Sequence, residues 1–322
     1  MSAARKRRAS DEKLKRPCFI GLYEDALAAG PKVYGNVEEA ILFSFTVANG
    51  AFKRTSRNRF GGFDKVTIDI LRESICVRDH FAVHDLAVSD ARTAAELFSK
   101  LSGECKSAFD FYATDLCLKV TAMRRPGTRP VVVIDEQKNV LQLMFAPFVL
   151  PVRPSTRREK WFYPVNSGLR RILMRTAVKE ILRLNEAGDS SLERREILLV
   201  CQEARNALER CSNFHLETYD AFARAPRSYS VVRAMNLLNR SYFSDHALAT
   251  VIANIADSML EGGIFITGSN FEAGSTVNGA IYRKQSNGFM PIYASGKGSP
   301  VDDLIPKTIA PSHSLIRSGT HG

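Results

Sequence analysis

The sequence lacks most features that would mark a membrane protein, a metalloprotein or a disulfide scaffold. No apolar run approaches the ~18 residues that a membrane-spanning helix needs. The 6 cysteines form no CxxC pair, and they form no cluster with any of the 6 histidines at zinc-ligand spacing. There is no internal repeat. We therefore expect no metal site and no transmembrane segment. Scattered cysteines also predict reduced thiols, and hence a cytoplasmic protein.

What the chain does have is a basic balance and enough apolar residues for a sizeable core. Its 322 residues are 45% hydrophobic and carry a formal net charge of +11. This length suits one large domain or two modest ones. Residues 1–17 are charged, with no apolar core behind them, which predicts a disordered basic tail rather than a secretory signal. The positive charge is spread along the chain, which favours a solvated basic surface over a nucleic-acid groove.

Residues 230–268 are the most informative stretch, because they predict a strand, a polar turn, an amphipathic helix and a second strand. Ser244 and Asp245 suit the N-cap of that helix, and Gly262 suits its end. Such a unit has parallel strands and a right-handed crossover. Ligands of open α/β sheets bind outside the carboxyl ends of strands. Five residues crowd that end of the first strand: Arg233, Asn236, Asn239, Tyr242 and Phe243. Turn formation is the alternative role of Asn236 and Asn239, and packing in the core or at the helix start is that of Tyr242 and Phe243.

A second strand–helix–strand unit is predicted over residues 81–115. Its first strand ends at Asp85 and its second at Asp115, with a helix over 93–101 between them. A turn rich in small residues, which include Ala87, Ser89 and Ala91, follows the first strand. Matching acids at two neighbouring strand ends indicate a ligand site, although acids also serve as helix caps and turn formers.

The remaining segments predict the domain organisation. Residues 18–79 suggest a helical N-terminal cap, and 80–303 the main α/β domain. An insertion at about 124–190 contains a β-hairpin and a basic helix, and a second hairpin falls within 279–293. Residues 304–322 carry Pro, Ser, Gly and Thr, which predicts a flexible tail.

Taken in order, these elements resemble the class I S-adenosylmethionine-dependent methyltransferases. The resemblance covers roughly residues 80–295 and implies an α/β fold: a Rossmann-like sheet that closes with an antiparallel hairpin. A helical N-terminal cap and an inserted hairpin and helix segment would be added to it. Locally, residues 232–243 are similar to the chemotaxis protein-glutamate methyltransferases, in which an Arg-Asn turn precedes a Tyr-Phe pair.

The resemblance also implies roles for individual residues. Asp85 would lie beside the methionine end of S-adenosylmethionine, and Asp115 would accept hydrogen bonds from its two ribose hydroxyls. Asp220 would lie near the adenine, and Asn236 at the point of methyl transfer. The cofactor would approach the backbone at the turn formed by Ala87, Ser89 and Ala91. Arg233, Asn239 and Tyr242 would contact the acceptor.

The family usually has glycines where this chain has Ala87, Ser89 and Ala91. A left-handed conformation costs a residue with a Cβ about 1–2 kcal/mol. Two alternatives follow: the turn uses ordinary φ values, or cofactor binding is weakened or lost.

The leading hypothesis is therefore methyl transfer from S-adenosylmethionine to an unidentified acceptor. A catalytically inactive scaffold or regulatory binding protein with the same fold is the second hypothesis, and basic nucleic-acid binding is the last. The insertion has basic residues near an apolar run, which also permits peripheral contact with an anionic membrane. These basic residues are Arg157, Arg158, Lys160, Arg170, Arg171 and Arg175.

Overall fold

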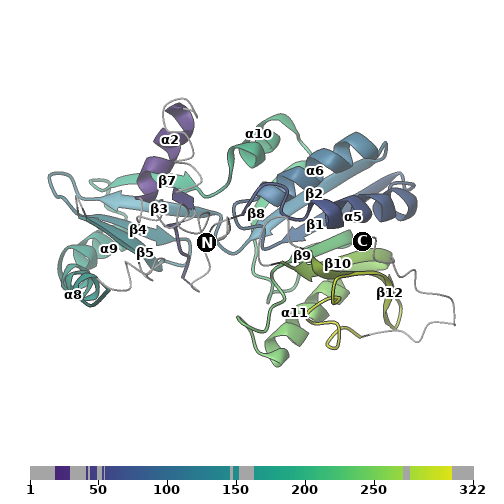
Figure 1. Cartoon of the computed structure of the whole chain (residues 1–322). Coiled ribbons are helices and arrows are strands. Elements are labelled where there is room, and N and C mark those ends of the chain that lie inside the picture. Colours follow the sequence, from purple (N-terminus) through teal and green to yellow (C-terminus); the bar gives the residue numbers. More distant parts are fainter. Residues whose placement is uncertain are drawn as a thin grey trace, which may run out of the picture. The chain divides into compact units, whose positions relative to one another are not determined.

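The computed structural model describes residues 19–29, 41–42, 44–48, 53, 55–145, 148–151, 163–270 and 276–306. The chain forms two compact units. The first contains residues 1–54 and 117–201, and the second contains 55–116 and 202–322 (Figure 1). In the described residues, no helix combines the length and the apolar character needed to cross a membrane.

This division differs from the predicted one. The expected N-terminal cap at 18–79 is shared between the units, because Ile20, Tyr23 and Phe45 pack with the strands of the inserted region. The inserted part itself is wider than predicted and spans 117–201. The predicted tail at 1–17 lies outside the described residues, as does 307–322 of the predicted C-terminal tail.

The second unit contains a seven-stranded sheet in the order β12-β11-β10-β9-β1-β2-β8. The strands β8, β2, β1, β9 and β10 are parallel, and β11 and β12 close the sheet as an antiparallel hairpin. Their bounds are β1 His80–Leu86, β2 Ala108–Asp115, β8 Phe214–Thr218, β9 Tyr229–Met235, β10 Met259–Ser269, β11 Asn278–Gln285 and β12 Gly288–Ser295. The chain proceeds outward from β1 to β8 and returns to β9, so the strand order reverses between β1 and β9. The Rossmann-like α/β fold is as predicted.

Helices cover both faces of this sheet (Figure 1). On one face, α5 (Gly61–Ser74) and α10 (Gln202–Arg210) each contact α6 (Arg92–Glu104). On the other lies α11 (Asp245–Ser258), whose apolar residues join a core cluster with Phe265, Tyr282 and Phe289. As predicted, Ser244 caps α11, and its hydroxyl accepts the Ala247 N–H at 3.3 Å. Gly262 does not end the helix as expected: it lies inside β10 with φ 71°, where the strand register shifts.

The first unit is built on a five-stranded antiparallel sheet in the order β6-β5-β4-β3-β7. The bounds are β3 Lys119–Arg124, β4 Val131–Asp135, β5 Val140–Phe145, β6 Phe148–Pro151 and β7 Glu193–Leu198. Successive side chains of a strand point to opposite faces. Val131 and Val133 therefore join one apolar cluster, with the short helices η1 (Ile20–Leu22) and α2 (Tyr23–Ala29), while Val132 and Ile134 join another. The predicted hairpin is the β4–β5 pair.

The second of these clusters is covered by a helical segment with an irregular middle. It runs through α8 (Tyr163–Leu173), a π-helical turn η2 (Met174–Val178) and α9 (Lys179–Glu186). Leu173, Val178 and Ile181 are buried against the sheet. Residues five apart point in different directions on a regular α-helix. The wider π turn allows both Leu173 and Val178 to face the core.

One pair of cysteines corrects the expectation of free thiols. Cys76 and Cys105 form a disulfide between the chain segments that follow α5 and α6. Cys117, Cys201 and Cys211 are not part of a disulfide. Disulfides persist mainly in oxidising compartments. This bond therefore removes the basis on which the cytoplasmic prediction rested.

Candidate functional site

The candidate site lies in the second unit, at the carboxyl end of the parallel strands where the strand order reverses. There β1 and β9 are neighbours, and Asp85 is in register with Arg233. On the other side of β1, Leu86 is in register with Thr114, so Asp115 lies at the same edge. The topology thus brings Asp85, Asp115 and Arg233 to one edge of the sheet, as the sequence predicted.

The turn after β1 adopts the backbone conformation of a glycine-rich turn without any glycine. Ala87, Ser89 and Ala91 have φ values of 55°, 59° and 57°. Each would cost about 1–2 kcal/mol in isolation, so surrounding contacts must hold the turn. The turn does not use ordinary φ values, so the first alternative posed by the sequence is wrong, and the second, weakened or lost cofactor binding, stays open.

Hydrogen bonds from the backbone hold this 87–91 turn in place. The Val88 N–H donates to the Thr114 carbonyl at 3.0 Å, and the Ala91 N–H donates to the Val88 carbonyl at 2.8 Å. The Ser89 N–H donates to Oδ2 of Asp115 at 2.8 Å. Val88 and Ala91 are buried, which anchors the turn on both sides of Ser89. Only Ala87 and Ser89 are partly exposed between Leu86 and Ala95.

Asp115 connects this turn to the end of β2. Its carboxylate accepts the Ser89 N–H from the turn, and an ionised carboxylate acts only as an acceptor. Asp115 is half-buried, so the group is accessible from the solvent side of the sheet edge. The predicted ribose-binding acid and the predicted cofactor turn are therefore in direct contact.

Arg233 is a buried ion rather than an exposed contact. Its Nη1 donates to Oδ2 of Asp85 and to the Thr93 carbonyl, both at 3.2 Å. Its Nη2 lies 3.5 Å from Oδ1 of Asp64 on α5, and its guanidinium lies 5.3 Å from the centre of the Phe60 ring. The side chain is 1% exposed, so in this structure it presents no surface to an acceptor, and its predicted contact with substrate is not what the geometry shows. We call Asp64, Asp85 and Arg233 the buried ion cluster.

The buried ion cluster changes the protonation of its acids. Burial raises the pKa of Asp85 to about 6; the Arg233 charge opposes this effect, and the Asp64 charge adds to it. Burial also raises the pKa of Asp64, against the charges of Arg233 and Lys100. Asp85 is thus inside the protein and bound to an arginine, which makes it a support for the sheet edge.

His84, beside Asp85 on β1, makes a hydrogen bond to the neighbouring strand β2. Its Nε2 lies 2.9 Å from Oγ1 of Thr114. Burial lowers the pKa of His84 to about 3, and the charge of Arg227 lowers it further. The imidazole is therefore neutral near pH 7.

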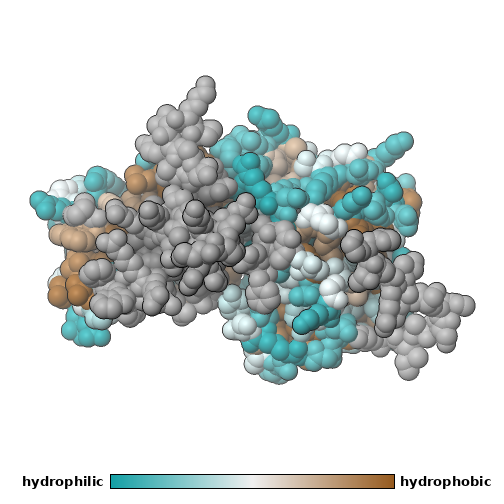
Figure 2. Space-filling model, in the orientation of Figure 1, coloured by the Kyte–Doolittle hydropathy of each residue, from teal (hydrophilic) through white to brown (hydrophobic). Residues whose placement is uncertain are grey.

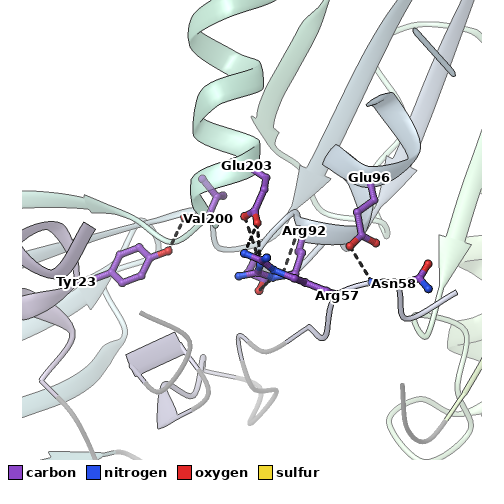
Figure 3. Close-up of polar contacts among 8 residues, drawn as sticks. Tyr23, Arg57, Asn58, Arg92, Glu96, Val200 and Glu203 are labelled. Atoms are coloured by element: carbon purple, nitrogen blue, oxygen red, sulfur yellow. Dashed lines mark hydrogen bonds and ion pairs between the residues drawn. The ribbon is translucent and has the colours of Figure 1, made fainter. Parts of the chain in front are cut away.

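A second ion cluster at the start of α6 was not predicted. Arg92 is buried: its N–H donates to Oδ1 of Asp90 at 3.2 Å, and its Nη1 lies 3.2 Å from Oε1 of Glu203. Figure 3 shows Arg57 reaching the same carboxylate, with its Nη2 at 2.6 Å. Glu203 lies on α10, about 110 positions along the chain, and no local motif links it to Arg92. In the first unit, the same figure shows the Tyr23 hydroxyl donating to the Val200 carbonyl.

The segment before α5 joins the turn region to the ends of β9 and β10. The Asn58 N–H donates to Oε1 of Glu96 on α6 (Figure 3), and the Nε of Arg59 donates to Oδ1 of Asn270. The Asn270 N–H in turn donates to Oδ1 of Asn236, whose φ is 57°. The predicted transfer residue Asn236 thus belongs to a polar chain with Asn270 and Arg59.

Three predicted site residues, Asp220, Asn239 and Tyr242, lie in the turns that follow β8 and β9. Asp220 is exposed, and its Oδ1 accepts the Phe222 N–H at 3.0 Å. Asn239 makes the same kind of turn with the Ser241 N–H at 2.8 Å. Tyr242 is 67% exposed. Asn239 thus has the turn-forming role that was its alternative. Asp220 follows Tyr219, whose N–H donates to the Asp115 carbonyl at 3.0 Å, and the predicted place of Asp220 near the adenine stays a prediction.

Metal chemistry has no support in the described part of the chain. Across those residues, no group of three or more His, Cys, Asp or Glu side chains could hold a metal ion. The acids of the site are instead occupied with arginines and backbone N–H groups.

Comparison with solved structures finds similarity to methyltransferases. An N-methyltransferase from Bradyrhizobium japonicum WM9, crystallised with S-adenosyl-L-homocysteine, is 12% identical, with a TM-score of 0.29 over 66% of this chain and 63% of that one. An amino pentose methyltransferase from Micromonospora echinaspora with bound S-adenosylmethionine is 8% identical, with a TM-score of 0.29 over 71% and 65%. An S-adenosylmethionine-dependent methyltransferase from Clostridium acetobutylicum ATCC 824 is 8% identical, with a TM-score of 0.32 over 82% and 71%.

The matched region spans less than two thirds of the length of the first two structures. No protein-family model and no curated protein sequence matches the chain. TM-scores of this size are too low to assign an activity, so the functional conclusion depends on the geometry of the site.

Proposed function

We propose that the second unit binds S-adenosylmethionine and transfers its methyl group to an acceptor. One observation carries this proposal: Ala87, Ser89 and Ala91 all hold left-handed backbone conformations in the turn after β1, beside the point where the strand order reverses. Backbone strain of this kind persists where the surrounding structure enforces it, and it concentrates at ligand sites. Ligands of open α/β sheets bind at this point.

The residues present fit the cofactor. Small side chains at Ala87 and Ser89 allow a ligand to approach the turn, and the third small residue, Ala91, is buried and faces the interior. Asp115 contacts the turn through the Ser89 N–H, and a half-buried carboxylate at this edge suits a pair of ribose hydroxyls. A left-handed turn brings the backbone close to a ligand in the way that glycine normally permits.

Each part of the site then has a distinct task. The 87–91 turn and Asp115 hold the cofactor, which supplies an already activated methyl group when bound. The buried ion cluster keeps β1, β9 and α5 in register behind the turn. Asn236, fixed by the Asn270 N–H, lies at the end of β9 and positions the acceptor. Placing acceptor and methyl group in line supplies most of the rate enhancement expected of such an enzyme.

The acceptor class follows from the absence of a base among the described site residues. Asp85 is bound to Arg233, and His84 is neutral and buried. A nucleophile that needs no strong base, such as a carboxylate or an amine, suits this site. The narrower resemblance to chemotaxis protein-glutamate methyltransferases rests on residues 232–243 alone and stays a prediction, as does a cytoplasmic location.

Calorimetry with S-adenosylmethionine and S-adenosylhomocysteine tests the proposal. We expect micromolar binding by the full chain and a loss of about 100-fold or more in Asp115→Ala, because hydrogen bonds to a charged group contribute about 1.5–3 kcal/mol each. Asp110→Ala, which changes an acid on the same strand outside the turn, is the matched control and should bind like the wild type. Failure of the folded wild-type protein to bind either compound would overturn the proposal and favour a scaffold with this fold.

A further inference from the structure

The outer face of the helical segment 163–186, in the first unit, combines cations with exposed aliphatic side chains. Val165 and Ile172 on α8 are 70% and 63% exposed. They are seven residues apart, so they lie on the same side of the helix. Arg171, Arg175 and Lys179 follow each other at intervals of four, and all three are exposed. We call these five residues the outer face; apolar residues reach the surface of this unit in Figure 2.

The charge on the outer face is of one sign. No acid occurs between residues 163 and 179. Arg183, one turn further on, is paired with Glu180, but Arg171, Arg175 and Lys179 form no ion pair with any residue of the described chain. Unpaired cations at this spacing attract a polyanionic surface and not a single small anion.

Packing of the helix does not account for the aliphatic residues. The inward side is already supplied by Leu173, Val178 and Ile181, which are 9%, 0% and 2% exposed. Val165 and Ile172 add little to that core. A helix with aliphatic side chains at the surface, flanked by arginine and lysine, has the pattern of helices that lie in the interface of a membrane.

We propose that the outer face binds the surface of an anionic phospholipid bilayer. Val165 and Ile172 would enter the boundary between headgroups and acyl chains, while Arg171, Arg175 and Lys179 contact the anionic headgroups. Single-stranded nucleic acid is disfavoured as the occupant, because its bases stack on aromatic side chains and the outer face has none. The inference is independent of methyl transfer, since it concerns only the first unit.

Sedimentation with vesicles tests this inference on the full chain. We expect binding to phosphatidylcholine vesicles that contain roughly 30% phosphatidylserine, and little binding to phosphatidylcholine alone. The triple variant R171Q/R175Q/K179Q should bind about 100-fold more weakly, at about fivefold per charge. V165S/I172S should retain the salt-dependent attraction but bind more weakly than the wild type.

A matched triple variant separates this face from general basicity. K106Q/R210Q/R224Q removes the same charge from exposed, unpaired positions of the second unit and should bind vesicles like the wild type. Equal losses of vesicle affinity in the two triple variants would overturn the proposal. The proposal would also be overturned if the wild type and the control both failed to bind vesicles. Tighter binding to an oligonucleotide that displaces the vesicles would reassign the face to nucleic acid. Thermal unfolding of each variant shows that it is folded.

Discussion

The two sheets of this protein differ in where their charged side chains lie. In the antiparallel sheet of the first unit, both faces are packed mainly with apolar side chains, and exposed cations lie on the helix that covers one face, although Lys53 of this unit is buried. In the parallel sheet of the second unit, arginines are buried at the carboxyl edge: Arg92 and Arg233 are among its largest fully buried side chains. Burying an ion is costly unless it is paired, and both arginines are paired with acids.

The two sheets also differ in the kind of polar group that they bury. The antiparallel sheet has buried but uncharged or turn-forming polar groups: Oε1 of Gln142 accepts the Ile20 N–H at 2.9 Å, and Oδ1 of Asp135 accepts the Asn139 N–H at 2.8 Å. The parallel sheet has buried arginine–acid pairs at its carboxyl edge, next to the strained 87–91 turn.

The largest effect that would separate the two units is expected from removing Arg233, the central buried ion. Arg233→Met would remove the arginine that pairs with both Asp85 and Asp64, and we expect a loss of about 3–5 kcal/mol in the free energy of unfolding. Hydrogen exchange should rise in peptides from β1 and β9 and stay unchanged in those from β3 to β5. Ile181→Ala, an apolar deletion in the first unit, should give the reverse pattern with a loss of about 2–5 kcal/mol. Equal exchange in both units after Arg233→Met would contradict the distinction.

A smaller effect is expected from pH. The folded pKa of Asp85, about 6, is above its ordinary value of 3.8, so the folded state binds the extra proton between these values. Its contribution to stability is full below pH 4 and is lost as the pH rises through about 6. The difference corresponds to about 3 kcal/mol at 1.36 kcal/mol per pH unit.

Asp85→Asn removes this titration. Chemical denaturation at pH 4 and at pH 7 gives the free energy of unfolding of both proteins. From pH 4 to pH 7, the value for the variant should rise relative to that of the wild type by up to about 3 kcal/mol. Asp110→Asn is the control: hydrogen bonds from His215 and His80 lower the pKa of Asp110, so the shift has the opposite sign. A constant difference between Asp85→Asn and the wild type across this range would show that Asp85 does not titrate as a buried acid.

The smallest effect concerns the turn itself. Ala87→Gly and Ser89→Gly should each stabilise the protein by about 0.5–1 kcal/mol, because relief of the left-handed strain exceeds the entropy cost of glycine. Ala91→Gly should be near neutral, since it also removes a buried methyl group. Ala95→Gly, inside α6, should destabilise by about 1 kcal/mol. Destabilisation by Ala87→Gly, measured by thermal unfolding, would show that the turn is not strained.

Much of the second unit could be predicted because its signals are local. The strands ending at Asp85 and Asp115, the cap at Ser244 and the hairpin after Gly279 each depend on residues close together in the sequence. The contact between Asp115 and the 87–91 turn follows from the parallel pairing of β1 and β2, which places their carboxyl ends side by side. The prediction that Gly262 ends the helix was wrong, because a positive φ suits a strand irregularity as well as a helix end.

The sequence alone determined the order of elements, the composition of the cores and the chemical groups available at the sheet edge, since periodicity and turn residues specify these within short segments. The tertiary structure decided which of those groups meet. It placed Asp64 and Glu203 beside arginines from distant segments, drew Ile20 and Tyr23 into the inserted unit, and forced Ala87, Ser89 and Ala91 into left-handed conformations. Contacts between distant segments and enforced strain depend on the packing of the whole unit, and no local pattern encodes them.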